Sequence, residues 1–277
     1  MPSDPPVPAP GSPPVLSAPL RVKYRIRFQK AGDLRLVSHH DLLHCFERMF
    51  RRAALPVART QGFNPRPRVW FAQSLALGVV GLNEALEVEL TEALEPAELQ
   101  HGLESQCPAG LAILSVKPID MRNRAQVRRA HFRLPLTEPI PDLLERCSAF
   151  LAQEHCWIER TRPHHRRLDL RPFIHTLRPS ADALEMILWV SSYGAARPEE
   201  VAEALGLRAV LEAGAVIERT DLQLADEAID SEMPPAGLPL HPDSDKSRPE
   251  ETGDKNEDRV SAPRPTAIIA GPMSFDS

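Results

Sequence analysis

Apolar residues occupy every second position from Val22 to Phe28, and Lys23, Arg25 and Arg27 lie between them. This period of two is typical of a half-buried β-strand, with one face in a core and the other in solvent. Such a strand is stable only beside other strands and under a covering layer. We therefore expect residues 22–28 to be the first strand of a sheet with helices on one face.

The following residues continue with helix and strand signals in the order βαββαβ, which is the ferredoxin-like pattern. Ser38 and Asp41 have the spacing of a capping box, and Ser38 is the expected N-cap. The expected elements are a helix at 41–54, strands at 69–74 and 86–90, a helix at 96–107 and a strand at 111–116.

The second half of the periodic region predicts another round of the same pattern. Pro198 at a helix start and Gly206 after Leu205 bracket its last helix. The expected elements are strands at 132–136 and 157–160, a helix at 142–153, a hairpin of 168–177 with 184–190, a helix at 198–205 and a strand at 216–224.

These signals predict an α+β fold of two consecutive ferredoxin-like (βαββαβ) units, at 21–121 and 122–225. Residues 1–20 are Pro-rich, and residues 226–277 are Pro-rich and acidic. Such segments bury too little apolar surface to fold, so both are expected to be disordered tails. Whether the two units share one sheet is left open by the sequence.

The net charge of −5 conceals a strong asymmetry. Residues 21–70 hold twelve Lys and Arg against three acidic residues, whereas residues 226–277 hold twelve acidic against five basic residues. A basic block attracts anionic partners but also forms ion pairs within its own fold. For Lys23, Arg25 and Arg27, pairing with Glu87 and Glu89 is favoured, and an anion-binding sheet face is the alternative.

The sequence contains no known motif for a metal cluster, a nucleotide site or a hydrolase, and no membrane or secretory segment is predicted. The four cysteines are widely spaced, which favours reduced core residues over a zinc or iron–sulfur site. The motifs GxxxxGK[ST], GxGxxG, HExxH and GxSxG do not occur. With no apolar run of about 18 residues and no signal-peptide pattern, we expect a soluble, cytoplasmic protein with no cofactor, no metal and no membrane contact.

The segment from Gln61 to Arg68 is the most distinctive stretch of the chain. Gly62 permits unusual backbone angles, and two prolines stiffen the loop, which keeps arginines displayed for a phosphate or carboxylate. A helix face just before it is also basic, although a solvated face is its more ordinary interpretation. The candidate anion- or RNA-binding residues are Arg48, Arg51, Arg52, Gln61, Asn64, Arg66 and Arg68.

Histidines cluster at the start of the first helix. His39 and Asp41 are candidate catalytic residues for an acid–base pair, and a His/His/Asp cluster with His40 and His44 could bind a metal or relay a proton. Capping and packing is the favoured role for either adjacent histidine, and the sequence predicts no metal site.

Short stretches spread along the chain resemble the radical-SAM-linked family of uncharacterised bacterial proteins. They are Tyr24–Gly32, Ser38–Leu42, Gln61–Pro67, Leu75–Val79, Asp169–Pro172 and Arg197–Pro198. The resemblance covers about residues 22–224, and it singles out Asp169, Arg171 and Arg197 as a motif of the second unit. It implies a radical-SAM protein as partner, while this chain lacks cluster-binding cysteines of its own.

Three functions remain as hypotheses. The first is a binding module that presents RNA, with tRNA as one candidate, or another anionic substrate to a radical-SAM partner. The second is a protein–protein adaptor without RNA binding. The third is an enzyme with a His39/Asp41 acid–base site, although the sequence favours no activity of the chain on its own.

Overall fold

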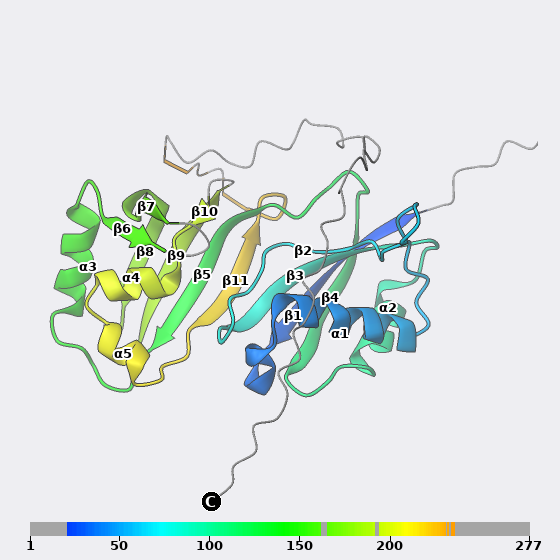
Figure 1. Ribbon diagram of the computed structural model, residues 1–277, viewed down its shortest axis with the longest axis horizontal. Helices are drawn as coiled ribbons and strands as arrows, with labels where there is room; N and C mark the ends of the chain where they lie inside the picture. Colours follow the sequence, from blue (N-terminus) through cyan, green and yellow to red (C-terminus); the bar gives the residue numbers. More distant parts are fainter. Residues whose placement is uncertain (1–20, 162–164, 192–193, 231, 233, 236–277) are drawn as a thin grey trace, which may run out of the picture. The chain divides into compact units, whose positions relative to one another are not determined.

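The computed structural model describes residues 21–235 except 162–164, 192–193, 231 and 233 (Figure 1). Its first half contains β1 (Val22–Lys30), a short 3-10 helix η1 (Gly32–Leu36), α1 (His39–Arg52), β2 (Val69–Phe71), β3 (Val80–Leu90), α2 (Pro96–Glu104) and β4 (Leu111–Ile119). The second half contains β5 (Val127–Pro135), α3 (Leu143–Ala152), β6 (Trp157–Arg160), β7 (Arg166–Asp169), a 3-10 turn η2 (Arg171–Phe173), β8 (Ile174–Pro179), β9 (Ala183–Ser191), β10 (Gly194–Ala195), α4 (Pro198–Ala204), α5 (Arg208–Glu212) and β11 (Glu218–Leu224).

Nine strands form one mostly antiparallel sheet in the order β10-β9-β5-β11-β3-β1-β4, with β2 also paired to β3 and β8 to β9. The only parallel pairing in the described chain joins the halves, where Glu218 and Arg219 of β11 lie beside Val80 and Gly81 of β3. The two halves therefore share a sheet. Whether each half is a ferredoxin-like unit stays a prediction.

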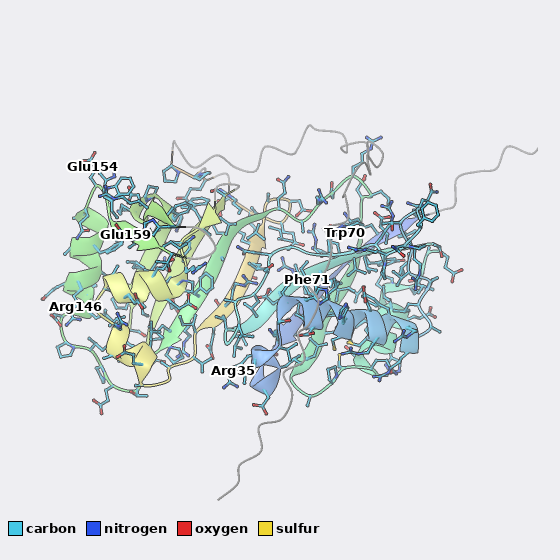
Figure 2. All side chains as sticks on the ribbon, in the orientation of Figure 1. Arg35, Trp70, Phe71, Arg146, Glu154 and Glu159 are labelled. Atoms are coloured by element: carbon cyan, nitrogen blue, oxygen red, sulfur yellow. The ribbon has the colours of Figure 1, made fainter. Side chains whose placement is uncertain are left out.

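Two apolar clusters lie where the helices pack on the strands. In the first half, Phe28 of β1 contacts Phe46 of α1 with ring centroids 5.0 Å apart. The ring of Phe71 on β2, which Figure 2 labels, lies 5.8 Å from Phe28 and 5.7 Å from Phe46. The second cluster holds Phe132 of β5, Phe150 of α3 and Val201 of α4. Alternate residues of each strand enter these clusters, so the other residues lie on the opposite face of the sheet.

Two sequence predictions about elements are corrected. The strand at 157–160 exists, but β6 pairs with β7 in a separate two-stranded sheet. The hairpin expected from 168–177 is interrupted by η2, so that β8 begins only at Ile174. Pro172 removes a backbone donor at this point, which breaks the ladder.

The first strand is also more buried than its alternating pattern predicts. Tyr24, Ile26 and Phe28 are buried as expected, but Lys23 and Arg25 on the other face are buried as well. The prediction of a half-buried strand is therefore wrong. Among the described helices, none is both long enough and apolar enough to cross a membrane.

Candidate functional site

A layer of paired charges occupies the face of the sheet opposite the helices. Arg25 is only 1% exposed and lies directly across from Glu87 on β3, with 2.9 Å between its Nη2 atom and Glu87 Oε1. Lys23 Nζ lies 2.7 Å from Glu87 Oε2. This confirms the predicted internal pairing of β1 with Glu87. Glu89 contacts Arg21 and Arg68 instead, at 3.8 and 3.4 Å.

Residues after β11 complete this layer with carboxylates. Arg25 Nη1 donates to Asp226 at 2.9 Å and to Glu227 at 2.8 Å. Glu227 also accepts hydrogen bonds from Arg27 and lies 2.5 Å from Lys117 Nζ. Burial alone would raise the pKa of Glu227, but hydrogen bonds from Lys117, Arg25 and Arg27 outweigh it and lower that pKa to about 2.

The same acidic segment continues across the second half of the sheet. Asp230 pairs with Arg128 at 2.8 Å and with Arg129, and Glu232 lies 2.9 Å from Arg129 Nη1. The expectation that the tail is disordered from residue 226 is therefore wrong for Asp226–Asp230 and Glu232, because buried arginines need anionic partners. We name Lys23, Arg25, Arg27, Arg128, Arg129, Lys117, Glu87 and the acidic residues 226–232 the sheet network. Residues 231, 233 and 236–277 of the predicted tail, and residues 1–20, lie outside the described residues.

The segment Gln61–Arg68 forms the end of a hairpin. Thr60 N donates to Arg66 O at 2.8 Å, and Arg68 N donates to Ala58 O at 2.8 Å. Gln61, Gly62, Asn64 and Arg66 are exposed at the tip. Gly62 has a φ of 136°, which only glycine adopts readily. Phe63 at the same tip is fully exposed, with a relative accessibility of 107%.

Three exposed arginines lie on the second half of α1, and two more lie on the hairpin. Arg51 and Arg59 line one groove of about 340 Å³ between the two elements. Arg48 and Arg52 are exposed one turn from each other on α1, and Arg66 is exposed on the hairpin. Within the described chain, the side chains of Arg48, Arg51, Arg52 and Arg66 form no ion pair or hydrogen bond, and Arg59 bonds only the carbonyl of Pro65. We name Arg48, Arg51, Arg52, Arg59 and Arg66 the arginine patch.

Arg68 does not belong to this patch. Its side chain is half-buried, with Nη1 3.4 Å from Glu89 Oε2. The sequence-based expectation that Arg68 is displayed with Arg66 is therefore wrong. The hydrogen bond from Glu89 N to Arg68 O holds residue 68 against β3. Arg66 lies two residues earlier, at the exposed tip of the hairpin.

His39 faces a very small cavity beside α1. The cavity, of about 10 Å³, is lined by His39, Lys30, Gln73 and Glu84 together with apolar side chains. Partial burial of the ring, followed by the charges of Lys30 and His40, lowers the pKa of His39. Its ring packs edge-on against Phe71 at 4.8 Å.

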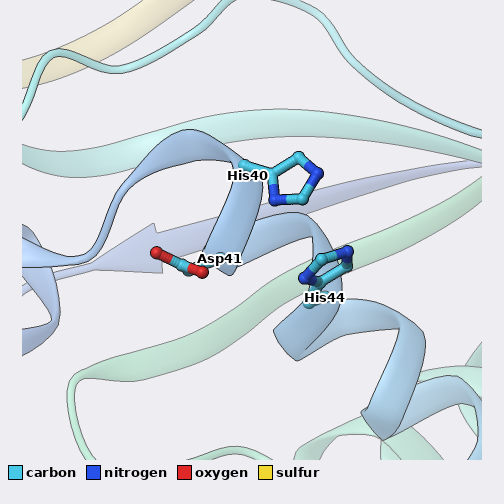
Figure 3. A group of neighbouring side chains, drawn as sticks. All are labelled: His40, Asp41 and His44. Atoms are coloured by element: carbon cyan, nitrogen blue, oxygen red, sulfur yellow. The ribbon is translucent and has the colours of Figure 1, made fainter. Parts of the chain in front are cut away.

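Asp41 has different neighbours from His39. Ser38 Oγ donates to Asp41 Oδ2 at 2.7 Å, and Asp41 N donates to Ser38 Oγ at 3.2 Å, which confirms Ser38 as N-cap. In the described part of the chain, His39 and Asp41 share no hydrogen bond. They therefore do not form the pair that the enzyme hypothesis requires. Asp41 lies instead near His40 and His44 (Figure 3).

The motif of the second half is occupied by structural contacts. Asp169 accepts hydrogen bonds from Cys156 N at 2.8 Å and from Arg171 N at 3.1 Å. The Arg171 guanidinium donates to the carbonyls of Leu151 and Ile174. Arg197 is the N-cap residue of α4, and its backbone N donates to Glu200 at 2.9 Å. These contacts hold turns, and the three residues lie on elements other than those of the arginine patch.

Comparison with known proteins identifies a family. Residues 23–198 match the model of a family described as "Uncharacterized protein conserved in bacteria (DUF2344)". The chain belongs to this family. The matched residues include β1, α1, the hairpin and the motif of the second half, whereas β11 and the acidic segment lie beyond them.

Comparison with curated proteins gives no match. Among solved structures, the chain is similar to a crystal structure of an unknown protein from Galdieria sulphuraria. The two are 16% identical, the match covers 74% of this chain and 99% of the other, and the TM-score is 0.24. At this TM-score the likeness supports no structural argument.

Two parts of the site were missed by the sequence reasoning. Arg59 lies on the first arm of the hairpin and lines the groove beside α1, but it belongs to neither expected motif. The carboxylates of Asp226 and Glu227 were assigned to a tail, although they follow the last strand directly. One signal in the sequence could have indicated these partners: the first strand carries more basic residues than Glu87 and Glu89 can neutralise.

Proposed function

We propose that this chain is a binding module for RNA or another polyanion, acting through the arginine patch and Phe63. The observation that carries the proposal is a set of exposed arginines without ion pairs in the described chain, two of them on the hairpin whose tip exposes Phe63 fully. Arginines neutralise phosphates, and an aromatic ring stacks on an unpaired base. Arg51 and Arg59 of this surface, together with Glu47 and apolar side chains, line the groove between α1 and the hairpin.

The fold favours the arginine patch over the open face of the sheet as the RNA-binding surface. We interpret the halves as two ferredoxin-like units, since their strand orders are β4-β1-β3-β2 and β11-β5-β9-β8. Four-stranded sheets of RNA-binding domains stack bases on the open sheet face. In this chain that face carries the sheet network, so an external anion would have to displace the acidic segment 226–232. The arginine patch needs no such displacement.

The patch can be tested by RNA binding with a charge-matched control. We expect a single-stranded RNA of about twelve nucleotides to bind the full chain, with the logarithm of affinity falling about 0.7 per phosphate contact per log unit of salt. The double variant Arg51→Glu/Arg66→Glu should weaken binding strongly and flatten this slope. The control Arg122→Glu/Arg124→Glu changes the same charge at exposed arginines outside the patch.

Fluorescence anisotropy of labelled RNA, at about 50–200 mM salt, measures both the affinity and its dependence on salt. Equal weakening by the two double variants would reduce the effect to net charge. Absence of salt-dependent binding by the full chain would refute the RNA proposal.

The radical-SAM partner is a further part of the proposal, supported by the resemblance of the sequence motifs. Affinity purification of the tagged chain from its native cells, followed by analysis of both protein and RNA, tests it. Recovery of a radical-SAM protein together with a defined RNA is the expected result. If the protein partner is recovered without RNA, the adaptor function is favoured instead.

One observation favours the adaptor as second candidate. Leu36 and Leu77 are 57% and 66% exposed, and a hydrogen bond from Gly78 N to Arg35 O brings their two segments together. Exposed apolar side chains that adjoin one another are typical of a protein-docking surface. The adaptor hypothesis therefore predicts that Leu36→Ser/Leu77→Ser abolishes capture of the partner protein while leaving RNA binding unchanged.

A further inference from the structure

We propose that His40, Asp41 and His44, at the start of α1, form a binding site for a borderline divalent metal ion such as Zn²⁺ (Figure 3). Its three ligands do not belong to the arginine patch, although Arg48 follows His44 by one turn of α1, and the proposal does not rest on RNA binding. It also revises the sequence-based expectation that the chain has no metal site.

The helix brings the three side chains together. His40 and His44 are four residues apart, which places them on one face of α1 one turn from each other. Their ring centroids are 4.2 Å apart, and one ligand atom of each of the three residues lies within 4.8 Å of the others. In a tetrahedral zinc site, ligand atoms about 2.0 Å from the metal are roughly 3.3 Å apart. Small rotations of these surface side chains close the difference.

The donor atoms are available to a metal. In the described chain, none of the ring nitrogens of His40 and His44 takes part in a hydrogen bond or ion pair. Asp41 uses one carboxylate oxygen to accept from Ser38 Oγ at 2.7 Å. Such a bond from a neighbouring hydroxyl orients a carboxylate ligand and leaves its other lone pairs free.

The charges determine which ion fits. The N-terminal end of a helix disfavours any cation, so coordination bonds from the imidazoles and the charge of Asp41 must supply the affinity for the metal. Imidazole nitrogens bind Zn²⁺, Ni²⁺ and Cu²⁺ strongly, and one carboxylate compensates part of the ionic charge. Three protein ligands leave a fourth position for water or for a donor from a partner molecule.

Calorimetric titration of the full chain, without a histidine tag, with ZnCl₂ at pH 7.5 tests the site. We expect one Zn²⁺ per chain, and at least a tenfold loss of affinity in His40→Ala and in His44→Ala. Asp41→Asn should lose about tenfold or more, in the range seen when ligand or supporting groups are removed. The matched control is His101→Ala, an exposed histidine on α2.

Two further measurements sharpen the result. Lowering the pH to 5.5 should weaken Zn²⁺ binding, because both imidazoles must be deprotonated to bind. Co²⁺ should give a visible absorption band with the wild-type chain that is absent in His40→Ala/His44→Ala. Zn²⁺ binding that survives in this double variant, or a folded chain that binds no Zn²⁺, would overturn the proposal. His40 is exposed and His44 is half-exposed, so their replacement should leave the fold intact, and circular dichroism checks that α1 remains folded.

Discussion

The sheet network and the arginine patch have similar basic content but lie in opposite environments. In the sheet network, each basic side chain lies within ion-pair distance of a carboxylate: Lys23, Arg25, Arg27 and Lys117 contact Glu87, Asp226 or Glu227, and Arg128 and Arg129 contact Asp230 or Glu232. In the arginine patch, the charged groups are exposed and four of the five arginines have no partner in the described chain.

The difference shows what burial does to a charge. A desolvated cation costs several kcal/mol unless a carboxylate is hydrogen-bonded to it, so the buried arginines are committed to their own fold. An exposed arginine bears little such cost and remains available to a ligand. The same residue type therefore stabilises one region and can bind partners in the other, and substitutions should separate the two roles.

The largest expected effect is the loss of Arg25. Arg25→Ala removes the partner of Glu87, Asp226 and Glu227 together and leaves Glu87 buried beside Lys23 alone. Breaking one side of a buried ion pair costs about 3–5 kcal/mol. Urea unfolding of the full chain measures the free energy of unfolding. Arg51→Ala is the control, with an expected change within about 0.5 kcal/mol.

If Arg25→Ala and Arg51→Ala were equally mild, the sheet network would contribute no net stability and the contrast between the two regions would be lost. If Arg25→Ala instead released only the residues after β11, the free energy of unfolding would fall by less, and proteolysis near Asp226 would increase. That outcome would assign the network to docking of the acidic segment alone.

A second, smaller effect is the pH dependence that Glu227 gives to the folded chain. Its pKa is about 2 in the fold against an ordinary value of 4.5, so its contribution to stability is fully present above pH 4.5. This contribution is lost as the pH falls from 4.5 towards 2, because the folded state resists protonation of the carboxylate. The free energy of unfolding should therefore fall with pH across this window, as measured by urea unfolding.

Glu227→Gln should flatten the fall between pH 4.5 and 2. Glu92→Gln changes an exposed carboxylate without a partner in the described chain and should leave the profile unchanged. A profile of the same steepness in Glu227→Gln would show that other carboxylates cause the acid sensitivity.

Local sequence patterns predicted much of the fold. The period of two fixed β1, and the S-x-x-D spacing located the start of α1, because both depend on neighbouring residues. Pairing of β1 with Glu87 was also predicted, since the ferredoxin-like order makes β1 and β3 neighbours. These successes all rest on short-range or pattern-level information.

The remaining features depend on contacts between distant residues. The parallel pairing of β11 with β3 joins residues about 140 positions apart, and no local signal encodes it. Asp226 and Glu227 look like tail residues until Arg25, about 200 positions earlier, is known to be buried. For the same reason, alternation alone could not show that Arg25 is buried and Arg66 exposed.

The smallest expected effect on stability, with a measurable effect on binding, is that of Phe63. Phe63→Ala removes a ring that touches solvent on all sides, so the free energy of unfolding should change by less than about 0.5 kcal/mol. Loss of a stacking ring should weaken binding of single-stranded RNA by roughly 1–3 kcal/mol. The control is Leu77→Ala, an exposed apolar residue outside the patch. Anisotropy with RNA and capture of the protein partner, measured on both variants, separate the two candidate functions. A loss of partner capture without a loss of RNA affinity in Phe63→Ala would assign the hairpin tip to protein docking, and the arginine patch would then need another ligand.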